Sequence, residues 1–172
     1  QGIPVAVGTT GWLAEKEAVD AYCEAKNGTY LYASNFSIGV NIFFKLNAYL
    51  ANLMAGQIAY KVNTKEVHHT AKKDAPSGTS ITLAEGIIAN LLEKSHWVNE
   101  KTEDPSALSI ISERIDPTPG THVIEYASAV DTIEIKHTAH SREGFAKGAL
   151  AVAAWLKDQK GVKKMDDFLE SV

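Results

Sequence analysis

The residue types best suited to chemistry lie close together in the segment 66–79. Two adjacent imidazoles, His68 and His69, are followed by the ammonium group of Lys72 and then by Ser77-Gly78-Thr79. Histidine exchanges protons near neutral pH, and a lysine beside it is a second proton donor. The segment therefore predicts a site of proton transfer.

The triplet Ser77-Gly78-Thr79 opens a helical pattern that runs to about Glu93. The first amides of a helix have no partners within the helix, and the helix dipole favours negative charge at that end. A glycine at position 78 lets a ligand approach the backbone closely. With the two imidazoles and Lys72, this indicates a small dianionic substrate that is protonated during the reaction.

One simpler interpretation of the segment stays open, and another is disfavoured. Pro76 to Thr79 is also what a solvated loop with a serine cap before a helix looks like. Metal binding by both histidines is disfavoured, because neighbouring residues at the end of a strand point to opposite faces. No cysteine or histidine stands at ligand spacing from them, so we expect no metal.

Small polar loops follow two predicted strands near the start of the chain. Gly8-Thr9-Thr10-Gly11 follows the apolar run 3–7, and Ala33-Ser34-Asn35-Phe36-Ser37 follows the strand 29–33. Ligands of parallel sheets collect at the carboxyl ends of the strands, so a nucleotide could lie across both loops. A third polar cluster, His137 to Arg142, is read more simply as a strand end with Ser141 capping a helix.

The elements that must position these residues change character along the chain. The order strand 3–7, helix 13–26 and strand 29–33 is the crossover unit of a parallel sheet. Further on we predict the helices 38–54, 79–93, 142–157 and 165–169, the strands 60–67, 108–115, 121–128 and 132–138, and an irregular segment 95–106. The predicted fold is therefore α/β: a partial Rossmann-like parallel unit followed by an α+β domain with a mixed, mostly antiparallel sheet.

Composition excludes several classes of function. The chain has 172 residues, a formal net charge of −4 and a single cysteine, Cys23. The charge argues against nucleic-acid binding, and one cysteine allows no intramolecular disulfide. There is no apolar run of about 18 residues, as a membrane span requires. We expect a cytoplasmic protein with no membrane or nucleic-acid partner.

The cluster resembles the signature segment of the dihydrodipicolinate reductase (4-hydroxy-tetrahydrodipicolinate reductase) family. The resemblance rests on Glu66-Val67-His68-His69, Lys72 and Asp74-Ala75-Pro76-Ser77-Gly78-Thr79. Further segments match in the same order: Gly8 to Gly11, Asn35 to Gly39, and His137 to Ala149. Such enzymes reduce a cyclic dicarboxylate in the diaminopimelate branch of lysine biosynthesis, using NADH or NADPH.

The resemblance implies a role for each matching residue. His68 would be the catalytic acid/base and Lys72 the proton donor, while His69, Gly78 and Thr79 would bind the substrate carboxylate. The nicotinamide half of the cofactor would contact Gly8, Thr10, Ala33, Ser34, Asn35 and Phe36. The family also implies a homotetramer.

The resemblance also suggests a domain organisation, with one departure. We expect residues 1–36 to be a remnant of the dinucleotide-binding domain and 37–150 to bind substrate and form the oligomer. Residues 151–172 would be helical and return to the first domain. The family's first strand and its glycine-rich turn have no counterpart here, so we expect weak dinucleotide binding and little turnover. The alternative is a non-catalytic module for tetramerisation and substrate binding.

Overall fold

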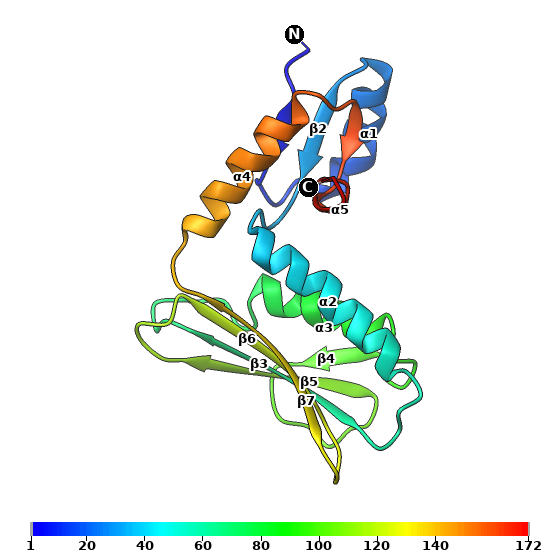
Figure 1. The fold of residues 1–172 in the computed structure, drawn as a ribbon, viewed down its shortest axis with the longest axis vertical. Coiled ribbons are helices and arrows are strands. Elements are labelled where there is room, and N and C mark those ends of the chain that lie inside the picture. Colours follow the sequence, from blue (N-terminus) through cyan, green and yellow to red (C-terminus); the bar gives the residue numbers. More distant parts are fainter. Residues whose placement is uncertain (1, 172) are drawn as a thin grey trace. The chain divides into compact units, whose positions relative to one another are not determined.

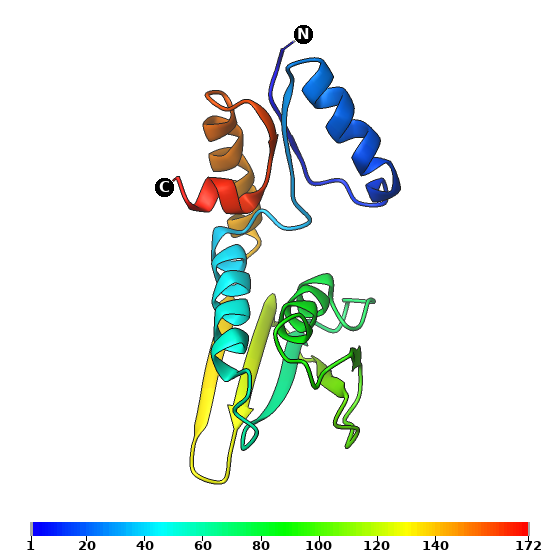
Figure 2. The ribbon, with the colours of Figure 1, turned by 90° about the vertical axis from the view of Figure 1, so that its right-hand side faces the viewer.

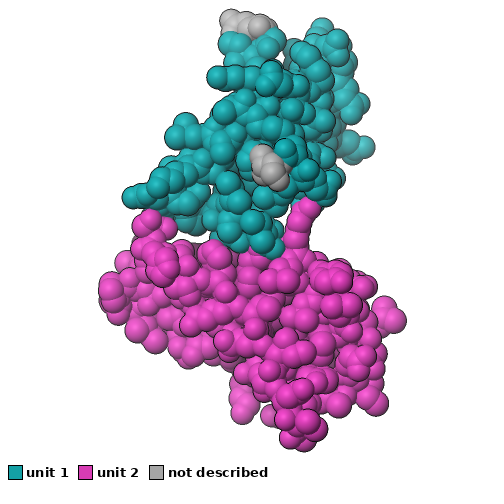
Figure 3. Space-filling view, in the orientation of Figure 1, with its two compact units in different colours: residues 1–42, 142–172 teal, residues 43–141 magenta. Residues whose placement is uncertain are grey.

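The computed structural model describes residues 2–171 and divides the chain into two compact units. Unit 1 comprises residues 1–42 and 142–172, and unit 2 comprises residues 43–141 (Figure 3). The helix α2 (Ile38–Met54) begins in unit 1 and continues into unit 2, and the expected domain boundaries, 36/37 and 150/151, stay predictions. Within residues 2–171, no helix combines the length and apolar character needed to span a membrane.

Unit 1 is built on a parallel sheet with the strand order β1-β2-β8, formed by Val5–Val7, Thr29–Tyr32 and Gly161–Lys163. A short 3₁₀ turn (Leu13–Glu15) precedes α1 (Lys16–Ala25), and α4 (Glu143–Leu156) lies on the opposite face of the sheet (Figure 2). The short helix α5 (Met165–Leu169) closes the unit. The predicted Rossmann-like parallel unit is confirmed, although β8 was not predicted.

Neighbouring residues of β2 show how the two faces are covered. Side chains alternate between the faces of a strand. The hydroxyl of Tyr30 donates a hydrogen bond to Asp20 of α1, while the next residue, Leu31, is fully buried in an apolar cluster with Val152 and Leu156 of α4. Both faces of the central strand are thus packed, as is usual in parallel sheets.

Unit 2 is a five-stranded mixed sheet with the order β4-β5-β3-β6-β7 (Figure 1). The strands are His96–Val98, Ala107–Arg114, Lys61–His68, Gly120–Ala127 and Thr132–Ala139 in that order. β3 pairs parallel with β5 and antiparallel with β6, which places it at the centre. The mixed sheet is confirmed. β4 lies in the segment 95–106 that was predicted to be irregular.

Two helices cover one face of this sheet. The described core joins residues of α2 and of α3 (Gly78–Ile88) to alternate residues of the strands. Members of this core with no more than 1% exposure are Ala51, Leu83, Ala84, Ile87, Leu108, Ile110, Ile124 and Tyr126. Because β3 alternates strictly from Lys61 to Glu66, every second side chain points toward the helices. That alternation decides which polar residues of β3 become buried.

Candidate functional site

The carboxyl end of β3 carries two polar side chains into the covered face of the sheet. Glu66 is 0% exposed and His68 is 7% exposed, while His69, just after the strand, is half-buried. A buried carboxylate needs hydrogen-bond donors to replace its water. The site is therefore organised around the partners of Glu66.

Glu66 receives hydrogen bonds from the start of α3 and from β5. The backbone N–H of Ser77 donates to both carboxylate oxygens at 3.1 and 3.2 Å. The hydroxyls of Ser80 and Ser112 donate at 2.9 and 2.8 Å, and Nη2 of Arg114 lies 3.3 Å from Oε1. Burial alone would raise the pKa of Glu66, but the bonds from Ser77, Ser112 and Ser80 outweigh it and lower the pKa to about 2. Glu66 is thus a permanent buried anion.

His68 packs between Glu66 and a second buried histidine. Its Nδ1 lies 3.4 Å from Oε2 of Glu66 and makes no regular hydrogen bond with any residue in 2–171. Its ring meets the ring of His122 on β6 edge-on, with 5.2 Å between centroids. Burial lowers the pKa of His68, and the charge of Glu66 opposes that shift. His68 is therefore held neutral at ordinary pH.

His122 extends the same network. Its Nδ1 lies 3.0 Å from the hydroxyl oxygen of Ser80, which itself donates to Glu66. Burial, together with the neighbouring His68, lowers the pKa of His122 to about 4. Three serines and two imidazoles thus surround one carboxylate.

The loop after β3 places Lys72 beside an acidic residue. Nζ of Lys72 lies 2.8 and 2.7 Å from the two carboxylate oxygens of Asp74. Arg114 holds this loop against β5, since it donates to the backbone carbonyls of Lys72 at 3.3 Å and of Asp74 at 2.6 Å. One guanidinium therefore links the lysine loop to the buried carboxylate.

The helix α3 begins beside this loop. Ser77 is its N-cap, and the hydroxyl oxygen of Ser77 accepts a hydrogen bond from the N–H of Ser80 at 3.2 Å. The amides of Gly78 and Thr79 form no hydrogen bond with any residue in 2–171. A Cβ added at Gly78 would meet no atom within 4 Å, so the space beside the Cα of Gly78 is open. This geometry suits an anion at the helix end.

Comparison with known proteins identifies the family. The profile described as "Dihydrodipicolinate reductase, C-terminus" matches residues 39–169. The chain belongs to the dihydrodipicolinate reductase family. A curated relative from Christiangramia forsetii, named 4-hydroxy-tetrahydrodipicolinate reductase, is 45% identical over 171 residues, which cover 99% of this chain and 71% of the relative. The resemblance read from the sequence is confirmed.

Other members of the dihydrodipicolinate reductase family agree with this. A 4-hydroxy-tetrahydrodipicolinate reductase from Methanococcoides burtonii is 37% identical, over 99% of this chain and 65% of its own length. The solved structure "Dipicolinate bound Dihydrodipicolinate reductase from Paenisporosarcina sp. TG-14" has a TM-score of 0.74 and 22% identity, covering 94% of this chain and 62% of that one. This chain thus spans about two thirds of the length of its reductase relatives, and the likeness of structure establishes the shared fold.

The residues expected to contact the cofactor of a reductase lie in unit 1. Gly8 and Thr10, after β1, and Ser34, after β2, are exposed at the carboxyl ends of parallel strands. The side-chain oxygen of Asn35 accepts a hydrogen bond from the N–H of Ser37 at 2.9 Å. Ala33 and Phe36 are buried in the apolar cluster of this unit. Gly8, Thr10 and Ser34 are therefore accessible, whereas Ala33, Asn35 and Phe36 shape the loop, and contact of these residues with a cofactor stays a prediction.

Several residues of the network were not among the predicted site residues. Glu66 was noted only as part of the cluster, although the alternation of β3 indicates that it is buried. Ser112 and Arg114 lie 46 and 48 positions from Glu66 in the sequence, and His122 lies 42 positions from Ser80. These residues reach Glu66 only because β3 pairs with β5 and β6, and no pattern within a short segment of the sequence predicts that pairing.

Glu66, His68 and His122 also have the composition of a metal site. One ligand atom of each lies within 4.8 Å of the others. However, both oxygens of Glu66 already accept hydrogen bonds, and the positive charge of Arg114 lies against one of them. Hydrogen bonds thus satisfy the carboxylate of Glu66, whereas Nδ1 of His68 has no regular hydrogen bond among residues 2–171. The expectation of no metal stays a prediction.

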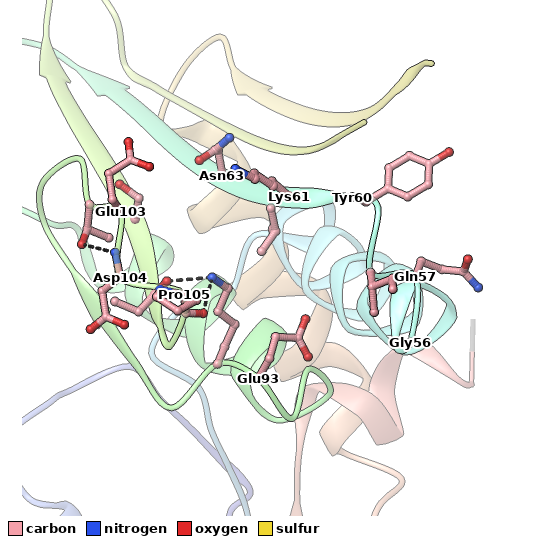
Figure 4. A pocket seen from close by; sticks show the side chains of 15 residues that line it. Gly56, Gln57, Tyr60, Lys61, Asn63, Glu93, Glu103, Asp104 and Pro105 are labelled. Atoms are coloured by element: carbon pink, nitrogen blue, oxygen red, sulfur yellow. Dashed lines mark hydrogen bonds between the residues drawn. The ribbon is translucent and has the colours of Figure 1, made fainter. Parts of the chain in front are cut away.

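Unit 2 also contains a cavity of about 340 Å³ (Figure 4). It is lined by residues at the start of β3, including Lys61 and Asn63, and by further charged residues of both signs such as Lys94 and Asp104. At about 3.3 Å per residue, Lys61 is roughly 23 Å along the strand from His68. The cavity is therefore not the proton-transfer site.

Proposed function

We propose that this chain carries the substrate-binding and proton-transfer part of a 4-hydroxy-tetrahydrodipicolinate reductase. The observation that carries the proposal is the pair of amides at Gly78 and Thr79, which have no hydrogen bond within residues 2–171 and directly follow Ser77. Ser77 and the buried His68 both contact the carboxylate of Glu66, and the loop of Lys72 leads from His68 to Ser77. Bare amides and a cation bind a carboxylate, and a neutral imidazole exchanges a proton with the same ligand. The names of the relatives support the choice of substrate.

In this proposal the residues of the chain bind the dicarboxylate and manage protons. When bound, NADH or NADPH supplies a hydride to the ring carbon, the carbon–hydroxyl bond breaks, and the hydroxyl leaves as water with one added proton. His68 acts as acid/base and Lys72 as proton donor, while His69, Gly78 and Thr79 hold a substrate carboxylate. Gly8, Thr10 and Ser34 would contact the nicotinamide half, within a loop shaped by Ala33, Asn35 and Phe36. A cytoplasmic location stays a prediction.

Pyridine-2,6-dicarboxylate, titrated calorimetrically into the chain, tests the proposal. We expect His69→Ala and Lys72→Ala each to weaken binding at least tenfold, because a hydrogen bond to a charged group contributes about 1.5–3 kcal/mol. The matched control is Lys73→Ala, which removes an exposed neighbouring ammonium group. Equal weakening by all three variants would mean attraction by net charge alone and would contradict a built site.

Asp74 provides a second test of the same site. Its carboxylate forms an ion pair with the ammonium group of Lys72, with both oxygens 2.7 and 2.8 Å from Nζ. A substrate carboxylate that binds Lys72 must therefore compete with Asp74. We expect Asp74→Asn to tighten dicarboxylate binding about two- to fivefold, as an exposed ion pair is worth about 0.2–1 kcal/mol. Weaker binding by this variant would show that Asp74 orients Lys72 rather than competing for it.

A second candidate function is a non-catalytic assembly module. β7 is an edge strand with no fully buried side chain, which leaves it available to another copy. Light scattering after gel filtration, combined with the dicarboxylate titration, separates the two functions. A homotetramer that does not bind dicarboxylate favours the module, whereas dicarboxylate binding that requires Lys72 favours the reductase site.

A further inference from the structure

The two nitrogens of the His68 imidazole face different neighbours. Nδ1 faces Oε2 of Glu66 at 3.4 Å and is buried without another partner in residues 2–171. On the other side, Nε2 faces Gly120 at the start of β6, where an added Cβ would lie 3.1 Å away. One nitrogen therefore meets a fixed anion, and the other meets a residue that has no side chain.

The hydrogen bonds of Glu66 leave Oε2 as the oxygen that faces His68. Arg114 and Ser112 both lie on Oε1, at 3.3 and 2.8 Å. Oε2 accepts from the hydroxyl of Ser80 at 2.9 Å and from the N–H of Ser77 at 3.2 Å. The strongest positive charge is thus on the far oxygen, and Oε2 retains its attraction for a proton on Nδ1.

The single hydroxyl proton of Ser80 determines which nitrogen of His122 is protonated. A serine hydroxyl has one proton, and that of Ser80 is donated to Glu66. Toward His122 the oxygen of Ser80 can only accept, so Nδ1 of His122 carries the proton of their 3.0 Å contact. One carboxylate therefore dictates the protonation pattern of two imidazoles.

We propose that Glu66 is a positioning residue that keeps the proton of neutral His68 on Nδ1, so that Nε2, beside Gly120, is the nitrogen that exchanges protons with the substrate. The assignment of a substrate to His68 rests on the proposed function. The tautomer of an imidazole is set by the partner of its other nitrogen. The charged groups that act on the ring besides Glu66 are Lys72, Arg114 and Asp74, and the neutral His122 packs against it.

Replacement of Glu66 by glutamine tests which nitrogen of His68 carries the proton. The donors on Oε1, Ser112 and Arg114, would retain the amide oxygen, which turns the NH₂ group toward His68. Nδ1 would then face a donor, and the proton would move to Nε2. We expect Glu66→Gln to invert the tautomer of His68, and that of His122 through Ser80.

Long-range ¹H–¹⁵N spectra of histidine-labelled protein in slightly alkaline buffer measure this directly. In the wild-type chain Nδ1 of His68 should resonate as a protonated nitrogen and Nε2 as an unprotonated one. The control is Ser112→Ala, which removes one bond to Oε1 and keeps the charge, and should leave the tautomer unchanged. A wild-type His68 protonated on Nε2 would overturn the proposal, as would a folded Glu66→Gln variant with no inversion. Should Glu66→Gln fail to fold, the wild-type and Ser112→Ala spectra decide.

The same spectra separate this inference from the proposed function. Addition of pyridine-2,6-dicarboxylate should shift the Nε2 resonance of His68 and leave Nδ1 protonated. An Nδ1–H tautomer with no response to the dicarboxylate would contradict the proposed function alone. A response to the dicarboxylate from a ring protonated on Nε2 would contradict only the positioning role of Glu66.

Discussion

Replacement of Gly148 by alanine is expected to destabilise unit 1 by at least about 3 kcal/mol, at or above the upper end of typical overpacking effects. Gly148 lies in α4, and a Cβ at this position would be 1.8 Å from the carbonyl oxygen of Phe36 and 2.8 Å from its carbonyl carbon. Both obstacles are backbone atoms, so no side-chain rotation relieves the overlap. Hydrogen exchange resolved by segment should show lost protection in residues 1–42 and 142–172, with residues 43–141 as internal reference.

Gly144, one turn earlier in the same helix, is the matched control for this prediction. A Cβ there would lie 3.4 Å from the hydroxyl oxygen of Ser37, which is an ordinary contact. Gly144→Ala should therefore be neutral or stabilising by up to about 1 kcal/mol, because alanine is the better helix former. Similar losses for both variants would mean that α4 requires glycine for flexibility and not for its close approach to Phe36.

Acid should weaken unit 2 through two groups, His122 and Glu66, whose pH ranges follow one another and overlap slightly. Burial lowers the pKa of His122 from 6.5 to about 4. Between these pH values His122 is protonated in the unfolded chain but stays neutral in the folded one. Stability therefore falls between pH 6.5 and about 4, by about 3 kcal/mol from this group. Glu66 adds a second loss as pH falls from 4.5 toward 2, because its folded pKa is about 2.

Urea unfolding of unit 2, followed by hydrogen exchange at a series of pH values, measures these losses. His122→Gln should flatten the dependence between pH 6.5 and 4, although His68, whose pKa burial also lowers, keeps part of it. His96→Gln, which replaces an exposed histidine of β4, should leave the dependence unchanged. An unaltered pH dependence in His122→Gln would show that His122 is not the group that titrates.

The part of the site that lies within a short stretch of chain could be predicted from the sequence, because neighbouring residues decide where a strand ends and where a helix begins. Alternation along residues 60–67 and the helix signals around Ser77 placed His68, Lys72 and Gly78 on a strand end, a loop and a helix start. The family's motif then supplied roles for residues that lie within a dozen positions of each other. Such features are readable because neighbours in the chain decide them.

The rest of the site depends on pairing between distant strands. Arg114 and Ser112 reach Glu66 only because β5 lies parallel to β3, with Glu66 opposite Ser112. His122 reaches the network because β6 pairs with β3, which places His122 directly opposite Glu66. β4 and β8 were missed for another reason: each has three residues, too few to show a hydrophobic period.

The sheet of unit 1 draws its strands from both halves of the chain, since β8 pairs with β2 from about 130 positions away. During synthesis, residues 43–141 leave the ribosome as one continuous stretch and can collapse at once, whereas β1 and β2 must wait for β8. The edge of β2 that pairs with β8 stays unpaired throughout that interval, and an unpaired strand edge is prone to aggregation.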